Sequence, residues 1–141
     1  MLQVREEQGR RVRPAFVHTG KLPGCNEYIN ACRANVHVGN KMKRDAQMEV
    51  YADILNAGVG RYGNPIKLRM VWHEPKSGNG HRRDFDNIVF AKKFILDAMQ
   101  DAHVIANDDL KHIVSITDEV IPEERPPHGV EVYIEEVERG W

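Results

Sequence analysis

The sequence has few cysteines, no long hydrophobic run and no excess of charge of one sign. Its two cysteines, Cys25 and Cys32, lie seven positions apart in a partly helical segment. A helix would separate their Cα atoms by roughly 10 Å, too far for a disulfide. No apolar stretch approaches the ~20 residues that cross a bilayer, and the first residues, MLQVREEQGRR, lack the apolar stretch of a signal peptide. These absences predict a cytoplasmic protein with reduced cysteines and no membrane partner.

The sequence also lacks the usual patterns of zinc ligands. Its seven histidines show neither HxH nor HxxxH spacing, and no CxxC pair is present, so a zinc site is not expected. Lys and Arg total 20 against 21 Asp and Glu, a net charge of −1. Nucleic-acid binding, if it occurs, must therefore come from a local basic patch and not from overall charge.

Composition places the chain among single globular domains. Of its 141 residues, 41% are apolar and 29% are charged, which is enough apolar surface for one core, and residues 1–141 are taken as one domain. The charge is segregated along the chain. Residues 61–93 hold eight bases and three acids, whereas residues 118–141 hold eight acids and two arginines. The near-zero total thus hides a basic middle and an acidic tail.

Hydrophobic periodicity predicts an α+β domain. Strand-like patterns occupy residues 13–19, 66–74, 111–121 and 129–137. Apolar residues recur every three or four positions from Lys41 to Ala57 and from Ile88 to about Asp101, as in amphipathic helices. This order favours a mixed β-sheet packed against two main helices.

The boundaries of the first helical region depend on caps and glycines. Asn26 is the expected cap of a short helix that is interrupted at Gly39-Asn40, and Gly58 is expected to end the 41–57 helix. Three bases, Lys41, Lys43 and Arg44, would then lie in a first helical turn. Positive side chains there interact unfavourably with the helix dipole. Either they are simply solvated, or a phosphate partner compensates for this unfavourable interaction. The glycine-rich residues 76–81 are expected to form a flexible hairpin or lid.

Acidic residues form the densest group of reactive side chains. The motif RRDFDN at 82–87 is followed, 22 residues after Asp86, by Asp108 and Asp109. Asp84 and Asp86, at positions i and i+2 of extended chain entering a helix, point to one side. An acid just beyond the helix is expected to return to the same end. Three converging carboxylates suit Mg²⁺ or Mn²⁺, ions that activate water and neutralise a phosphodiester in transition.

The same residues also have an ordinary structural interpretation. The flanking Arg82 and Arg83 could hold phosphates, but Asp84 could instead pair with either arginine. Asp86 is a plausible helix cap, and Asn-Asp-Asp at 107–109 is common turn chemistry. Spacing alone leaves both interpretations open.

Four motifs resemble one family. They are KLPGCNEY at 21–28, RRDFDN at 82–87, a lysine followed by FILDAM at 94–99, and NDD at 107–109. In this order they resemble the RusA-like Holliday junction resolvases, crossover junction endodeoxyribonucleases that are often carried by phages and prophages. The resemblance covers most of residues 15–120. It implies a RusA-like α+β fold and a hydrolase that acts in DNA recombination and repair.

The resemblance assigns roles by position. Asp84 and Asp86 match the paired acids of the family, and Asp108 best matches its late essential acid, which leaves Asp109 as a helper or surface acid. The catalytic lysine of the family usually lies four positions after the second acid, where this chain has Phe90. Anchoring on FILDAM instead selects Lys93, with three extra residues before it.

Helix geometry favours Lys93 over its neighbour Lys92. On an ideal helix, seven residues from Asp86 rotate about 700°, or about 20° short of two turns, so Lys93 stays on nearly the same face. Lys92 would point roughly 100° away.

The family acts as a homodimer on four-way DNA junctions with Mg²⁺. The resemblance implies that Asp84, Asp86 and Asp108 hold the metal and that Lys93 stabilises charge on the reacting phosphate. Other residues would contact DNA: Arg69, Arg82, Arg83, Lys41, Lys43, Asn26 and, if it does not simply pack, Tyr28. Two alternatives stay open. One is a catalytically silent DNA-binding or phage regulatory protein, which the Phe90 departure favours, and the other is a nuclease for different branched DNA or RNA.

Overall fold

A four-stranded mixed sheet with strand order β3-β6-β4-β5 forms the centre of the structure. The computed structural model describes residues 5–7, 10–76 and 83–138. The sheet strands are β3 (Phe16–Thr19), β4 (Ile66–Pro75), β5 (Ile113–Glu123) and β6 (Gly129–Glu136). The helices are α1 (Cys25–Ala34), α2 (Val36–Ala57), α3 (Phe85–Val89) and α4 (Lys92–Asp101). These elements confirm the expected α+β class.

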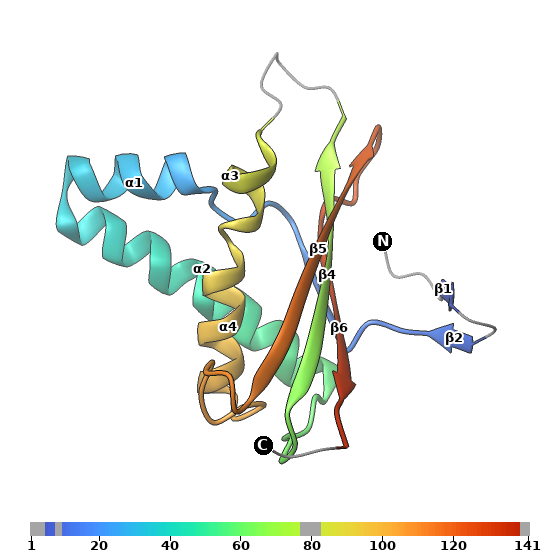
Figure 1. Cartoon of the computed structure of the whole chain (residues 1–141). Coiled ribbons are helices and arrows are strands. Elements are labelled where there is room, and N and C mark those ends of the chain that lie inside the picture. The colour runs from blue at the N-terminus through green and yellow to red at the C-terminus, as the bar shows by residue number, and fades with distance from the viewer. Residues whose placement is uncertain (1–4, 8–9, 77–82, 139–141) are drawn as a thin grey trace.

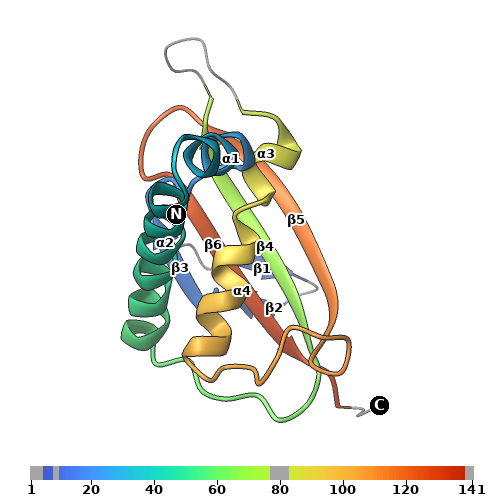
Figure 2. The ribbon, with the colours of Figure 1, turned by 90° about the vertical axis from the view of Figure 1, so that its left-hand side faces the viewer.

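The helices lie on one face of the sheet (Figures 1 and 2). A short antiparallel ribbon of β1 (Arg5–Glu7) and β2 (Arg10–Val12) lies on the opposite side. Within the sheet, β6 pairs antiparallel with β3 and β4, whereas β4 and β5 run parallel. A parallel pair needs a crossover connection, and α3 and α4 supply it. The crossover carries the chain from the carboxyl end of β4 back to the amino end of β5.

Alternation along β4 determines which of its side chains enter the core. Ile66, Leu68, Met70 and Trp72 are buried and belong to the core cluster on the helix side, as the period of two in a strand requires. The helices contribute Val50 and Ile54 of α2, and Phe94, Ile95, Ala98 and Met99 of α4. The sheet thus fixes α2 and the α3–α4 segment against one face.

Two buried histidines join elements through carboxylates. The Nδ1 atom of His18 in β3 lies 2.6 Å from a carboxylate oxygen of Asp53 in α2. His73 in β4 contacts Glu123 of β5 at 2.8 Å and the fully buried Glu131 of β6 at 2.5 Å. Acids of the carboxyl-terminal part therefore help to hold the sheet together.

The first helical region differs from the prediction. The break falls at Asn35, whose side chain accepts a hydrogen bond from the His37 N–H at 2.7 Å and so caps α2. The predicted interruption at Gly39-Asn40 is wrong, because Gly39 is buried inside α2 against α1. A Cβ atom at Gly39 would lie 3.0 Å from the Cα atom of Cys32, so this glycine permits close helix packing.

Two further boundary predictions need correction. The cap of α1 is Gly24 and not Asn26, which lies inside the first turn. Because α2 begins at Val36, Lys41, Lys43 and Arg44 lie in its second and third turns, where the dipole argument for a phosphate does not apply. The predicted end at Gly58 is confirmed, with a left-handed φ of 69°.

The second helical stripe, predicted from Ile88 to about Asp101, is divided into α3 and α4 around Phe90 and Ala91. The strands expected at 66–74, 111–121 and 129–137 are confirmed within two residues. β5 is an edge strand with Pro122 near its end, a location that tolerates a missing N–H. No helix of the described ranges is long and apolar enough to cross a membrane. The predicted lid at 76–81 lies, apart from Lys76, outside the described residues.

Candidate active site

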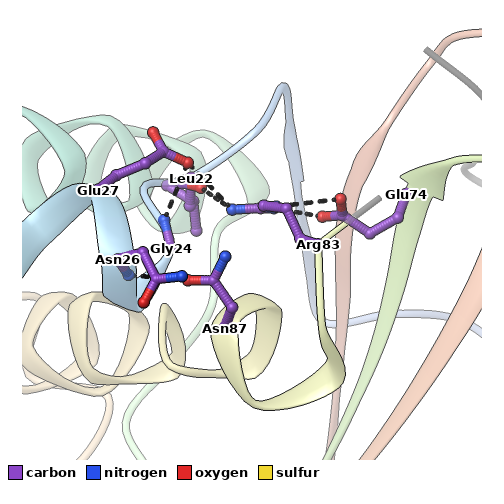
Figure 3. A network of polar contacts seen from close by, with 7 residues as sticks. All are labelled: Leu22, Gly24, Asn26, Glu27, Glu74, Arg83 and Asn87. Atoms are coloured by element: carbon purple, nitrogen blue, oxygen red, sulfur yellow. Dashed lines mark hydrogen bonds and ion pairs between the residues drawn. The ribbon is translucent and has the colours of Figure 1, made fainter. Parts of the chain in front are cut away.

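The amino-terminal ends of α1 and α3 meet beside the carboxyl end of β4 (Figure 3). The backbone N–H of Asn26 donates a hydrogen bond to Oδ1 of Asn87 over 2.9 Å. Gly24 makes this approach possible, because a Cβ atom there would lie 2.6 Å from Oδ1 of Asn87 and 2.9 Å from Nη1 of Arg83. Asn26 and Asn87, 61 positions apart in the sequence, are thus fixed next to the paired acids Asp84 and Asp86.

Arg83 holds this corner together. Its guanidinium forms an ion pair with Glu74 of β4 and donates to the Leu22 carbonyl over 3.1 Å, and it lies 3.5 Å from Glu27 of α1 (Figure 3). The Arg83 side chain is only 10% exposed. These contacts give Arg83 a structural role, and its predicted contact with phosphate stays a prediction. Arg82, its predicted companion, lies outside the described residues.

Asp84 and Asp86 are exposed at the start of α3. Asp84, and not Asp86, is the N-cap residue, with extended backbone and no side-chain capping bond. Arg83 pairs with Glu74 and not with Asp84, as the structural interpretation of the sequence had allowed. Within the described ranges neither carboxylate has a side-chain partner, which leaves both available to a ligand.

The structure does not bring Asp108 to these two acids within one chain. Asp108 lies in the segment between α4 and β5, at the opposite end of the crossover from α3 (Figures 1 and 2). Among the described residues, no three His, Cys, Asp or Glu side chains form a group that could hold a metal. The cause is topological: β4 and β5 are parallel, so a helix that starts at the carboxyl end of β4 finishes at the amino end of β5.

Asp109 organises the turn that contains Asp108. Its carboxylate contacts Nδ1 of His112 at 2.5 Å and accepts the Lys111 N–H over 3.1 Å. The hydrogen bond with His112 is the largest influence that holds the pKa of Asp109 below its usual range. Asp108 is exposed, and in the described part of the chain its carboxylate has no partner. Asp109 therefore has a structural role, whereas the Asp108 carboxylate is available to a ligand.

The two candidate lysines have different surroundings. Lys92 forms an ion pair with Asp118 of β5, which also accepts a hydrogen bond from Nε1 of Trp72 over 3.0 Å. The Lys93 ammonium lies 5.6 Å from the centre of the Tyr28 ring in α1. Lys92 is therefore engaged with the sheet, whereas Lys93 lies on the side of α4 that faces α1.

Phe90, at the position where the resemblance leads one to expect a lysine, packs among aromatic rings. Its ring lies 5.8 Å from the Tyr28 ring and 6.0 Å from the Phe94 ring, centre to centre. Tyr28 and Phe94 also meet, at 5.7 Å, so the three rings join α1 to α3 and α4. Since the chain leaves regular helix at Phe90 and Ala91, the ideal-helix rotation used to place Lys93 is only approximate.

The other predicted DNA contacts are dispersed. Arg69 lies with its guanidinium 4.5 Å from the centre of the Tyr133 ring, on the face of β4 that alternates away from the helices. Lys41 pairs with Asp45 at 2.6 Å, and Lys43 lies 4.0 Å from Asp97 of α4. Arg69 is thus separated by the sheet from Asp84 and Asp86, and of the described members of this set only Asn26 and Arg83 lie beside the acids.

Sequence reasoning missed the partners that build the corner, namely Gly24, Glu27, Glu74 and Asn87. Gly24 and Glu27 lie in the quoted motif at 21–28 and Asn87 in the motif at 82–87, but these motifs did not show that the residues contact one another. In the sequence, Glu74 belongs to a strand whose other residues on the buried side are apolar. Comparison with protein-family models and with curated proteins gave no match for this chain.

Proposed function

We propose that this protein is a Mg²⁺-dependent, structure-specific DNA endonuclease that nicks four-way junctions in paired fashion. One observation carries the proposal: two exposed carboxylates without described partners, Asp84 and Asp86, stand two positions apart on a corner that Arg83 and Asn87 make rigid. The resemblance of the surrounding RRDFDN motif to RusA-like resolvases supplies the reaction class and the cytoplasmic setting of DNA recombination and repair.

The donor set fits the proposed ion. Mg²⁺ prefers oxygen ligands, keeps several waters, and is commonly bound by one or two carboxylates together with a substrate phosphate. Asp84 and Asp86 would hold it, with Mn²⁺ as a substitute. When bound, the ion would lower the pKa of a water molecule and neutralise charge on the phosphodiester. Without a cation the two carboxylates repel one another, so they also exclude an unmetallated phosphate.

Lys93 and Asn26 are candidates for contacts to the DNA backbone. Lys93 projects from α4 towards α1, and Asn26 is exposed in the first turn of α1 beside Asn87. In the proposed enzyme Lys93 stabilises charge on the reacting phosphate. Asn26 positions a neighbouring phosphate, a contact that sets register without reading sequence.

We assign Asp108 to a site that two subunits of a homodimer share. Because Asp108 lies at the far end of the crossover from Asp84 and Asp86, we infer that it serves the site of a second copy of the chain. Each site of the dimer would then combine Asp84 and Asp86 with Asp108 of the partner subunit, and two such sites would face opposing strands of a junction.

Cleavage of a synthetic four-way junction tests the proposed reaction. The wild-type protein should nick opposing strands in Mg²⁺ and stop in EDTA. Asp84→Asn and Asp86→Asn should bind the junction but cut it more slowly by a factor on the order of 10² or more, the scale expected when a preorganised charged group is lost. Undiminished cutting by Asp86→Asn would refute the site. A wild-type protein that binds junctions but does not cut them would favour the silent DNA-binding alternative.

Subunit mixing tests the shared site. Asp84→Asn and Asp108→Asn homodimers should each be inactive, but a mixed dimer contains one site with no substitution. Refolding the two variants together should therefore restore nicking. If all three acids belonged to one chain, every site in the mixture would carry a substitution, and the mixture would stay inactive. A mixture of Asp84→Asn with Asp86→Asn is the matched control and should stay inactive in either case.

A further inference from the structure

The end of the α1–α2 hairpin that lies farthest from the sheet exposes apolar side chains. Figure 1 shows α1 and the first half of α2 extending away from the sheet. Val36, the first residue of α2, is 63% exposed, and Val38 is 49% exposed. The only buried residue of α1 is Ala31. We refer to residues 28–44 as the hairpin segment and to Val36 and Val38 as its apolar tip.

The residues around the apolar tip carry more positive than negative charge. The hairpin segment contains Arg33, Lys41, Lys43 and Arg44 and no aspartate or glutamate. Lys41 pairs with Asp45, the residue that follows the segment, and Lys43 lies 4.0 Å from Asp97 of α4. Arg33 and Arg44 are exposed and make no ion pair within the described ranges. Apolar side chains close in the sequence to unpaired cations are complementary to a polyanion that also offers apolar surface. Nucleic acid has both, in its phosphates and in the faces of unstacked bases.

The helix that leads into the hairpin segment starts at the candidate active site. The first turn of α1 is bonded to Asn87 of α3 through Asn26, and Val36 at the tip lies ten positions after Asn26. Ten helical residues span about 15 Å, which equals the rise of about four base pairs at 3.4 Å each. When Asp84 and Asp86 contact a phosphate near a branch point, the tip can therefore reach the branch itself.

The hairpin is fixed at its base and along its length. The Tyr28 ring packs on Phe90 and Phe94, so the α1 end near the acids cannot swing freely. Along the hairpin, α2 approaches α1 so closely at Gly39 that a Cβ atom there would lie 2.5 Å from Sγ of Cys32. A rigid helical pair of this kind can transmit force to DNA.

We infer that the apolar tip is a wedge that enters the opened centre of a branched DNA substrate. Val36 and Val38 contact unstacked bases at the branch, as apolar side chains do in proteins that kink DNA. Arg33 and Arg44 contact the flanking phosphates. This inference rests on the proposed function and adds how the enzyme distinguishes a junction from linear duplex.

A double variant, Val36→Ser with Val38→Ser, tests the wedge. Both residues are exposed, so folding should be unaffected, and circular dichroism checks this. Junction affinity should fall about tenfold or more, within the range that loss of base contacts produces, while affinity for linear duplex changes less than about twofold. A 2-aminopurine base at the branch should brighten when wild-type protein binds and should not brighten with the variant. Met48→Ser with Leu55→Ser, at exposed apolar residues of α2 outside the hairpin segment, is the matched control and should behave as wild type.

The salt dependence of DNA affinity tests the proposed role of Arg33 and Arg44. Arg33→Ala and Arg44→Ala should each reduce the slope of log affinity against log salt by about one, since each releases about one counterion fewer. Both should weaken junction and duplex binding alike. An unchanged slope in both variants would show that the hairpin does not contact DNA.

Failure of the wedge can be separated from failure of the proposed function. If wild-type protein cuts junctions and the double valine variant keeps its affinity and its fluorescence signal, the wedge is refuted and the nuclease stands. If wild-type protein binds no branched DNA, both are refuted. A change of molar mass of the valine variant in light scattering, or wild-type binding to phosphatidylserine vesicles that the variant loses while junction binding persists, would assign the tip to self-association or to lipid and would overturn the inference.

Discussion

At the scale of single residues, side chains next to one another in the sequence have separate roles in space. Arg83 is bound on three sides while the adjacent Asp84 is exposed. Lys92 is paired with the sheet while Lys93 faces α1. The identity of each residue was visible in the sequence. Its partners were not, because Glu74 and Asp118 come from strands whose register depends on the whole sheet.

Arg83→Ala should chiefly lower stability. The substitution leaves the buried Glu74 carboxylate without its partner, a change that costs about 3–5 kcal/mol for a buried pair. Urea unfolding measures the loss. Arg33→Ala, at an exposed arginine of α1, is the control and should change stability by less than about 0.5 kcal/mol. Unchanged stability combined with lost junction affinity would restore the role predicted from the sequence.

The two lysines should separate stability from activity. Lys92→Ala removes a charged partner of Asp118 and should cost roughly 1.5–3 kcal/mol of unfolding free energy. Lys93→Ala should cost little stability but should slow junction cleavage by on the order of 10², with junction affinity nearly preserved. Urea unfolding and single-turnover cleavage measure the two effects. If Lys93→Ala cuts normally and Lys92→Ala does not, Lys92 is the residue that acts on the phosphate.

The pH dependence of Asp109 follows from its contact with His112. Since the pKa of the folded carboxyl is lowered, its contribution to stability is present above the unfolded value of about 3.9 and is lost as the pH falls through the lower folded value. An NMR titration of the Asp109 carboxyl should give a midpoint below the ordinary range. In His112→Ala the midpoint should rise towards it, and equal midpoints in the two proteins would contradict the assignment.

At the scale of elements, periodicity predicted the strands and the two long helical stripes but not the points where helices meet. Gly39 was expected to break a helix, yet it lies where α2 packs on α1. Asn26 was expected to cap α1, yet Gly24 does so because only a residue without Cβ fits against Asn87. In both cases a tertiary contact, which a local pattern does not contain, determined the role of the residue.

Gly24→Ala should disturb the contact between α1 and α3. The added Cβ would push aside the Asn87 amide and the Arg83 guanidinium, both of which are held in hydrogen bonds. Overpacking of this kind costs about 1–3 kcal/mol, and we expect cleavage to fall with it because Asp84 and Asp86 lie on the same corner. Gly60→Ala, where the new Cβ meets no atom within 4 Å, is the control. Thermal unfolding of the two variants makes the comparison, and equal melting temperatures would argue against a tight corner.

At the scale of the whole molecule, the direction of the strands determines which acids lie close together. That direction could not be predicted from the sequence. A sheet of the expected mixed type was predicted correctly, but the parallel pairing of β4 with β5 places Asp108 far from Asp84 and Asp86. The same topology folds the acidic tail onto the basic middle. Lys76 lies 3.4 Å from Glu124, and Lys92 pairs with Asp118. The charge segregation of the sequence is thereby partly cancelled in space, whereas Arg33 and Arg44 of the hairpin segment make no ion pair among the described residues.

The exposed edge of β5 also bears on how the protein behaves at high concentration. An edge strand of eleven residues presents a row of unpaired backbone groups that could template the addition of another chain. Pro122 removes a donor from that row, and the exposed Glu119 places negative charge beside it, whereas Asp118 is paired with Lys92. Such features discourage stacking of strands from neighbouring molecules. The strand that completes the sheet thus also helps to keep separate molecules from polymerising through it.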